Sequence, residues 1–208
     1  EQITEQPIKV ITNGFDSEIS STQKLDKKFT ISHIGSMLTG RNPVKLWQVL
    51  SDLLKNNVDF KNALHLQFIG VISNDVLQSL NDLGLQAHFE VVGYVSHEKA
   101  IEFQKASQIL LLVEIDSQET IGIIPGKLFE YMAAKRPILG VGPKNWEVAD
   151  IITDTKSGYI FEYSDDIALK NVILDWFAQF QKGELSVSSK DIEQYSRREL
   201  TRKLAEYI

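Results

Sequence analysis

The chain has 208 residues, with 22 Lys and Arg against 28 Asp and Glu, a formal net charge of −6 and no Cys. This composition is typical of a soluble globular protein with one large domain, and the lack of Cys excludes thiolate nucleophiles and Cys-based metal or iron–sulfur sites. The acidic balance argues against nucleic acid or anionic lipid as a partner, and no apolar run approaches the roughly 20 residues of a membrane-spanning helix.

The chain begins without Met, and its polar, acidic start lacks the basic and apolar regions of a secretory signal. The polar start runs directly into an apolar segment. We therefore expect a piece cut from a longer protein.

Short apolar runs that are rich in β-branched or aromatic residues and bounded by turn formers predict buried strands. These runs span residues 29–34, 64–69, 87–92, 108–113, 137–141 and 158–161. The gaps between them carry apolar residues three and four apart, which indicates amphipathic helices. The expected helices span residues 44–54, 75–83, 96–106, 127–134, 145–152 and 165–180, with a more charged last helix over 191–208.

Some residues of these elements carry expectations of their own. In the helix over 96–106, Ser96 is expected to cap the first turn, and Ala100, Ile101 and Phe103 to be buried. Asp165 and Asp166 are expected to cap the next-to-last helix, and Trp47, Trp146 and Trp176 to pack in the core or on helix faces.

Apolar strands that alternate with helices require parallel pairing, with helices covering both faces of the sheet. The predicted fold class is therefore α/β, a doubly wound, mostly parallel, Rossmann-like sheet. Ligands of such sheets bind beyond the carboxyl ends of the strands, where turns and helix starts offer free N–H groups. Gly35, Gly70, Gly93 and the loop over 114–126 are expected at that edge.

The densest local signal is the segment from Glu119 to Leu139, in which a loop with Gly and Pro leads into a helix and then a strand. A phosphate cradle is one interpretation, and a flexible loop with solvated charges is the other. Glu130 favours the first, because a carboxylate on a mostly apolar helix needs a partner if it is buried, and a ribose diol is one such partner. Arg41, in the loop over 35–43, offers bidentate donors for phosphate.

Other chemistries find little support. None of the four His residues pairs with another at metal-ligand spacing, so all are interpreted as structural or solvated, and no metal site is predicted. The sequence contains no Gly-x-Ser-x-Gly elbow, Walker loop or complete Gly-x-Gly-x-x-Gly fingerprint. This counts against a hydrolase, a P-loop ATPase and a nicotinamide dehydrogenase.

Four segments resemble the C-terminal, donor-binding domain of retaining GT-B glycosyltransferases of the family-four type. Residues 8–16 end in Asn-Gly-Phe-Asp, residues 35–43 resemble the first donor-domain loop, and residues 92–95 resemble the base-side loop. The strongest match is Pro-Gly-Lys-Leu-Phe-Glu-Tyr-Met-Ala over 125–133, followed by Arg-Pro-Ile-Leu over 136–139. The resemblance extends from Ile8 to the last helix.

The sequence departs from the family at two points. The family commonly has two glutamates with seven residues between them, but the position of the first is Gly122, and Glu119 has ten residues between it and Glu130. The basic residue that often follows the second strand is missing from residues 70–74, and Lys127 is expected to take over part of its phosphate contact.

The resemblance implies the nucleotide-sugar-binding half of a retaining hexosyltransferase, with residues 1–20 as an interdomain linker, 21–187 as the donor domain and 188–208 as a helix on a missing N-terminal acceptor domain. The acceptor would be a glycan or a lipid-linked glycan, no cofactor would be needed, and this piece alone would bind but not transfer. The enzyme would be cytoplasmic and peripheral to the inner membrane. Arg41 and Lys127 would stabilise the charge of the leaving diphosphate. The expected donor-binding residues are Gly35, Arg41, Gly70, Gly93, Tyr94, Glu119, Gly122, Ile123, Ile124, Pro125, Gly126, Lys127 and Glu130.

Two alternatives remain open. A GT-B-type sugar-nucleotide epimerase shares the fold but needs an acid/base carboxylate and a His near the donor sugar, and such residues are scarce at the predicted edge. The other alternative is a non-catalytic α/β interaction module. The unusual position of the first glutamate supports it.

Overall fold

The computed structural model describes residues 8–16 and 23–207. Within them, six strands form one parallel sheet in the order β3-β2-β1-β4-β5-β6. The strands are β1 (Phe29–Ile34), β2 (Leu64–Ile69), β3 (Phe89–Gly93), β4 (Ile109–Val113), β5 (Ile138–Gly142) and β6 (Gly158–Glu162). The predicted fold class is confirmed, and this strand order has its switch point between β1 and β4.

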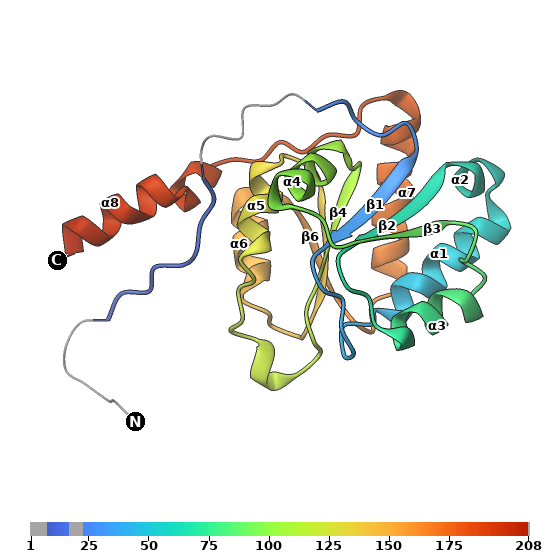
Figure 1. The fold of residues 1–208 in the computed structure, drawn as a ribbon, viewed down its shortest axis with the longest axis horizontal. Coiled ribbons are helices and arrows are strands. Elements are labelled where there is room, and N and C mark those ends of the chain that lie inside the picture. Colours follow the sequence, from blue (N-terminus) through green and yellow to red (C-terminus); the bar gives the residue numbers. More distant parts are fainter. Residues whose placement is uncertain (1–7, 17–22, 208) are drawn as a thin grey trace.

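Helices cover both faces of the sheet (Figure 1). The α-helices are α1 (Val44–Asn56), α2 (Val58–Ala63), α3 (Asn74–Asp82), α4 (His97–Ala106), α5 (Lys127–Ala133), α6 (Val148–Thr155), α7 (Ile167–Lys182) and α8 (Arg197–Tyr207), and the 3₁₀ turns are η1 (Gln118–Thr120) and η2 (Ile192–Tyr195). Helices α1, α2, α3 and α7 lie on one face, and α4, α5 and α6 lie on the other.

Each face has its own apolar core. On the first face, Phe29 of β1 makes edge contacts with Phe60 of α2 and Phe177 of α7, at ring-centroid distances of 5.8 and 5.3 Å. On the second, Phe129 of α5 and Trp146 are fully buried against β4 and β5. The three tryptophans are buried, as expected.

The edge strands correct the expectation that all strands are buried. β3 and β6 end the sheet on either side, and β3 has no buried residue while β6 has only Phe161. An apolar run indicates that a segment forms a strand, but its place in the sheet depends on pairing that the run does not encode.

Three helix expectations are also corrected. α2 was not predicted, because it has six residues and follows α1 after the single residue Asn57, whose side chain caps it by accepting from the Phe60 amide at 2.9 Å. α6 starts three residues later than expected, because Asn145 adopts φ +59 in a left-handed turn. The last helix is split at Ser196, which is extended and pairs with Phe15 in a short β-bridge.

Capping by Ser96 and Asp166 is confirmed, since their side chains accept from the amides of Lys99 and Ile167. In α4, however, Ala100, Ile101 and Phe103 are only half-buried, and the fully buried residue is Gln104. The reason lies in the site described next, where Gln104 meets a carboxylate of α5.

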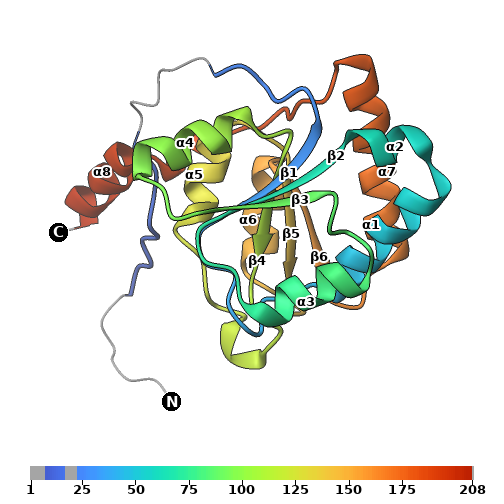
Figure 2. The same cartoon turned by 45° about the vertical axis from the view of Figure 1, so that its right-hand side comes forward.

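The two ends of the sheet carry different connections. Figure 2 shows the loop after β4 at one end, and the segment that leads from α7 to α8 crossing the other. α8 projects away from the sheet, and none of its described residues is buried.

Candidate donor-binding site

The first three strands end in glycines that stand side by side at the carboxyl edge. The Gly35 amide donates to the Ile69 carbonyl at 2.7 Å, and the Gly70 amide donates to the Gly93 carbonyl at 2.8 Å. Gly70 has φ +122, and a Cβ there would lie 2.6 Å from the Gly35 carbonyl oxygen. No other residue fits this position, so main-chain atoms form the floor of the site at this edge of the sheet.

A pocket of about 230 Å³ opens directly above this floor. Tyr94 forms one side of it and is 92% exposed. The pocket brings together three of the residues that the sequence singled out, Gly35, Gly70 and Tyr94. Its further lining residues are Ile34, Ile69, Val95, His97 and Ala100.

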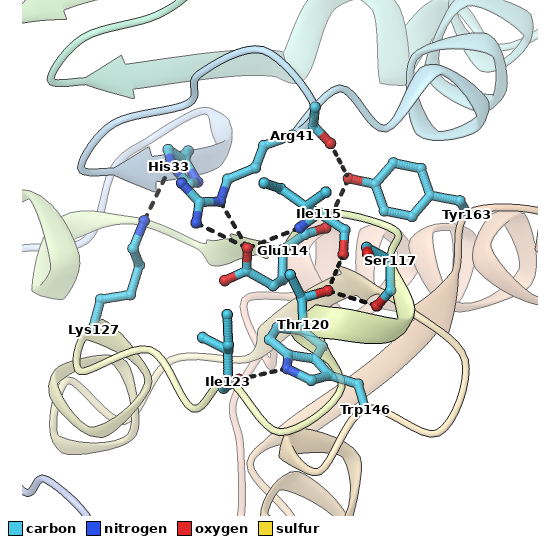
Figure 3. Close-up of polar contacts among 11 residues, drawn as sticks. His33, Arg41, Glu114, Ile115, Ser117, Thr120, Ile123, Lys127, Trp146 and Tyr163 are labelled. Carbon is cyan, nitrogen blue, oxygen red and sulfur yellow. Dashed lines mark hydrogen bonds and ion pairs between the residues drawn. The ribbon is translucent and has the colours of Figure 1, made fainter.

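An ion pair joins the segments that follow β1 and β4 at the switch point (Figure 3). Nε and Nη2 of Arg41 donate to Oε1 of Glu114 at 3.1 and 2.8 Å, and the Ile115 amide donates to the same oxygen at 2.9 Å. Glu114 follows β4 and is 2% exposed, whereas the Arg41 side chain is 28% exposed. The buried carboxylate thus fixes the guanidinium while Nη1 has no partner among the described residues.

Lys127, the first residue of α5, lies beside this ion pair (Figure 3). Its Nζ is 3.3 Å from Nε2 of His33, whose Nδ1 is 3.0 Å from the Leu111 carbonyl. Since that carbonyl can only accept, Nδ1 carries the proton and Nε2 accepts from the ammonium. Burial, and then the Lys127 charge, hold the pKa of His33 well below its usual 6.5, which keeps the ring neutral.

The pKa of Lys127 is also shifted by its surroundings. Burial, followed by the nearby Arg41 charge, lowers the pKa of Lys127 from 10.5 to about 8, although Glu114 and Glu130 act in the opposite direction. Nζ also lies 3.0 Å from where a Cβ at position 35 would be, so the ammonium sits over the end of β1. Two cations therefore meet at the switch point, with the buried Glu114 paired to Arg41 and the half-buried Glu130 near Lys127.

Glu130, one turn further along α5, is half-buried and has a partner within the chain. Its Oε2 accepts from Nε2 of Gln104 at 2.9 Å, and Gln104 is 1% exposed. Oε1 of Gln104 has no partner among the described residues. The opposite placement of the amide would set oxygen against the carboxylate, so the observed orientation is the favourable one.

The loop before α5 is anchored on its inner side. Oγ1 of Thr120 donates to the Ile115 carbonyl at 2.6 Å, and Nε1 of Trp146 donates to the Ile123 carbonyl at 2.7 Å. Glu119 is exposed in η1, and no ion pair or side-chain hydrogen bond links its carboxylate to another described residue. Gly122 and Gly126 are exposed, and Ile124 and Pro125 half-buried.

A carboxylate does lie beside Gly122, but it comes from another element. A Cβ at Gly122 would be 3.6 Å from Oε1 of Glu147, the residue that precedes α6. The Glu147 amide also donates to the Ile121 carbonyl at 3.0 Å, which fixes the two segments together. Sequence spacing could not reveal this carboxylate, because 25 positions separate it from Gly122.

The start of α5 offers fewer free amides than the sequence implied. The amides of Leu128 and Phe129 donate to the carbonyls of Pro125 and Gly126 at 3.0 and 3.2 Å. Asn13 is a neighbour that sequence reasoning did not assign to the site: its Nδ2 lies 3.9 Å from where a Cβ at Gly126 would be. Besides Glu147 and Gln104, sequence reasoning also missed His33, interpreted as structural or solvated, and Glu114, noted only as the start of a loop.

The described residues lack both a cluster of metal ligands and a membrane-spanning helix. Residues 8–16 and 23–207 contain no group of three or more His, Asp or Glu side chains that could hold a metal ion. Over the same ranges, no helix is long and apolar enough to cross a membrane.

The sequence of this chain matches a known protein family. The family profile described as "Glycosyl transferases group 1" matches residues 15–196. No curated protein has a matching sequence.

Solved structures share the fold at low identity. The chain superposes on WaaG, a glycosyltransferase involved in lipopolysaccharide biosynthesis, with a TM-score of 0.66 and 14% identity, covering 96% of this chain and 56% of that one. TarM of S. aureus, solved as a point mutant with Fondaparinux, α-GlcNAc-glycerol and UDP, gives 0.63 and 18%, covering 97% and 39%. The C-terminal domain of LpcC, a glycosyl transferase group 1 family protein from Francisella tularensis, gives 0.59 and 17%, covering 92% and 98%. The chain thus spans about half or less of the two longer proteins and nearly all of an isolated C-terminal domain.

Proposed function

The chain belongs to the glycosyl transferases group 1 family, and we propose that it is the part of such an enzyme that binds a nucleoside diphosphate sugar. The full-length enzyme transfers a hexose with retention to a glycan or lipid-linked acceptor. TarM and the pneumococcal O-GlcNAc transferase GtfA were both solved in complex with UDP, which supports a nucleotide donor at this fold.

The observation that carries the proposal is the pair of cations at the switch point, whose hydrogen bonds within the chain are incomplete. Lys127 is half-buried, and its only hydrogen-bond partner among the described residues is the neutral ring of His33. Arg41 is paired with Glu114 and keeps Nη1 uncommitted. A diphosphate placed against both side chains would accept their remaining hydrogen bonds, and it would be the leaving group whose developing charge these donors stabilise.

The neighbouring features fit the rest of a nucleotide. Oε1 of Glu130 remains for a ribose hydroxyl while Gln104 holds Oε2. The pocket over Gly35 and Gly70 adjoins Lys127, and we place the base there, beside Tyr94. Gly93 and the loop over 122–126 complete the donor-binding edge.

We assign the acidic position beside Gly122 to Glu147 rather than to Glu119, because the Glu147 carboxylate is the one that approaches Gly122. In the full-length enzyme, Glu147→Gln should lower kcat by at least tenfold with little change in the donor KM, and Glu119→Gln should leave both constants unchanged. The reverse pattern would return the role to Glu119.

We also propose that residues 1–20 link this domain to a preceding acceptor domain and that α8 packs on that domain. Support comes from α8 itself, which buries no described residue and exposes Leu204 and Tyr207 by 45% and 44%. The piece alone then binds donor without transferring sugar, and peripheral membrane contact would belong to the full-length protein. In this piece, the amides of α8 should exchange hydrogen faster than those of α5, and equally slow exchange would contradict a missing partner.

The epimerase alternative gains one observation, since His33 and Glu114 do lie at the strand edge. Both are buried and engaged, however: His33 with Leu111 and Lys127, and Glu114 with Arg41 and Ile115. Neither is exposed to act as an acid or base on a bound sugar. Incubating the full-length protein with a UDP-sugar alone separates the two activities, because only an epimerase converts the sugar without an acceptor.

Calorimetry on this piece tests the proposal directly. UDP, UMP and uridine should bind with decreasing affinity, and a ligand at 100 times its Kd should add about 2.7 kcal/mol to the free energy of unfolding. Lys127→Ala should weaken UDP and leave uridine nearly unchanged. If no nucleoside diphosphate from a panel of bases binds, the non-catalytic module becomes the better account.

A further inference from the structure

A second pocket, of about 370 Å³, lies at the opposite end of the sheet from the donor-binding edge. It is bounded by the start of β6, the end of α6, one side of α7 and residues 186–188, which belong to the segment crossing the amino edge (Figure 2). None of its lining residues takes part in the site described above, and the family resemblance gave no site residue at this end.

The pocket is held open by the chain itself. The crossing segment is tied on one side by the Leu185 carbonyl, which accepts from Nη2 of Arg136 at 3.4 Å. It is tied on the other by the Lys190 amide, which donates to the Thr155 carbonyl at 2.9 Å. Because both ends are fixed, residues 186–188 face β6 without needing a ligand to order them.

One wall is aromatic. Tyr159 of β6 is 53% exposed, and its ring contacts that of Trp176 in α7 at a centroid distance of 5.8 Å and an interplanar angle of 43°. Trp176 is only 5% exposed, so it positions the tyrosine and leaves most of the accessible ring surface to Tyr159. This gives the ligand a flat apolar surface of the size of one six-membered ring.

The remaining lining is polar and balanced in charge. Lys156 and Asp175 contribute one charge of each sign. Oδ2 of Asp175 accepts from Nε2 of Gln179 at 2.8 Å, so Oδ1 of Asp175 and Oε1 of Gln179 remain as acceptors. Ser186 and Ser188 add hydroxyls from the crossing segment.

This combination selects the ligand chemistry. A phosphate or a carboxylate would need an excess of cations, which the pair Lys156 and Asp175 does not provide. A purely apolar ligand would leave the serines and the carboxylate without partners. A pyranose ring has an apolar C–H face for the tyrosine and a rim of hydroxyls for the polar groups. We propose that this pocket binds a neutral sugar unit of an oligosaccharide, at a site separate from the donor-binding edge.

Such a site would serve a transferase in a specific way. A glycan anchored at the amino edge stays tethered to the enzyme, so the effective concentration of its other end near the active site rises. The inference does not depend on the donor site, because the two pockets share no residue.

The test uses saturation-transfer NMR and calorimetry with maltose, cellobiose, lactose and N,N′-diacetylchitobiose, each with and without saturating UDP. At least one disaccharide should bind with a Kd on the order of 1 mM. Its affinity should be the same in both conditions. Tyr159→Ala should weaken binding about tenfold or more. Tyr207→Ala removes a tyrosine of similar exposure outside the pocket and should have no effect.

A second variant protects the test against loss of the fold. Ser186→Trp fills the pocket from its exposed rim, and it should abolish disaccharide binding while UDP affinity and the melting temperature stay unchanged. The proposal is overturned if none of the four disaccharides binds, if binding survives Tyr159→Ala or Ser186→Trp, or if UDP displaces the sugar. UDP affinity is measured for every variant. A variant that loses the disaccharide but still binds UDP tests the sugar pocket alone, whereas loss of UDP binding in the wild type would contradict the donor site.

Discussion

Two cations at opposite ends of the sheet, the buried Arg136 and the half-buried Lys127, contrast a structural role with a proposed binding role. Arg136 precedes β5 at the amino edge and is 7% exposed. It donates to the carbonyls of Ser107 and Gln108 at 2.8 and 3.1 Å, to Oε1 of Gln108 at 3.1 Å and to the Leu185 carbonyl at 3.4 Å. Lys127, at the carboxyl edge, has one neutral partner among the described residues.

The difference teaches how to tell the two roles apart. Burial lowers the pKa of both side chains, so a lowered pKa does not distinguish the structural role from the binding role. Hydrogen-bond satisfaction does: a cation that makes several hydrogen bonds to main-chain carbonyls of the chain stabilises the fold, whereas one with a single neutral partner can still bind an external anion. The predictions below test this distinction.

The largest expected effect is on Arg136. Arg136→Ala leaves several buried carbonyls without donors and should lower the free energy of unfolding by about 3 kcal/mol, measured by urea denaturation. The affinity of the folded protein for UDP should stay the same. Arg136→Lys should fall between, because it keeps the charge without the planar fork. A loss below about 1 kcal/mol would show that the carbonyls find other partners.

Glu130 should give the next largest effect, and on binding rather than stability. Glu130→Gln should weaken UDP and uridine alike, by about 1–3 kcal/mol, the cost of mispairing a buried acceptor. Gln104→Met removes the donor that orients Glu130 and should cost less. Glu98→Gln, at an exposed position of α4, is the matched control, and calorimetry is the measurement. Unchanged uridine affinity in Glu130→Gln would remove the ribose role.

The pH dependence of UDP binding should be smaller and should come from Lys127. Its pKa in the free protein is about 8, and a bound diphosphate favours the charged ammonium. Affinity should therefore fall about tenfold between pH 7 and pH 9, as the free lysine loses its proton. His33 does not contribute in this window, because its pKa lies well below 6.5. Lys127→Arg should flatten the profile, and a wild-type profile that is already flat would contradict the assignment.

The smallest loss of stability is expected in Lys127→Met. The lowered pKa of Lys127 means that the fold disfavours the charged ammonium, so removing it should not lower the free energy of unfolding at pH 7, in contrast to Arg136→Ala. The pKa of Lys127 is about 8 in the fold against an ordinary 10.5, so the unfolded chain binds more protons between these values. The stability of the wild type should therefore rise with pH over that range relative to Lys127→Met. Urea denaturation at pH 7 and pH 10 measures both.

Most of the fold could be predicted because its signals are local. Apolar runs bounded by turn formers placed every described strand within two residues, and helical periodicity found seven of the eight α-helices in the described residues, with shifted ends in α6 and α8. α2 escaped because six residues carry too little of a period. The exposure of β3 and β6 depends on strand order, which no single strand encodes.

The site was less predictable, because its chemistry comes from residues far apart in sequence. Arg41 and Lys127 could be recognised in their loops, and the structure brings both to the switch point. The roles of His33, Glu114 and Gln104 could not be read from sequence, since each lies within or beside an apolar element and acquires a role only from its neighbour across the fold.

One contact joins the two walls of the donor-binding edge mechanically. The Tyr131 hydroxyl, fully buried in α5, accepts from the Ile34 amide at 2.9 Å and donates to the Ile34 carbonyl at 3.3 Å. Burial raises the pKa of Tyr131, so the phenol keeps the proton that this second bond requires. These two bonds therefore fasten the end of β1 to the helix that carries Lys127. Their spacing is set before any ligand arrives, and an anion entering between them needs little rearrangement of either wall.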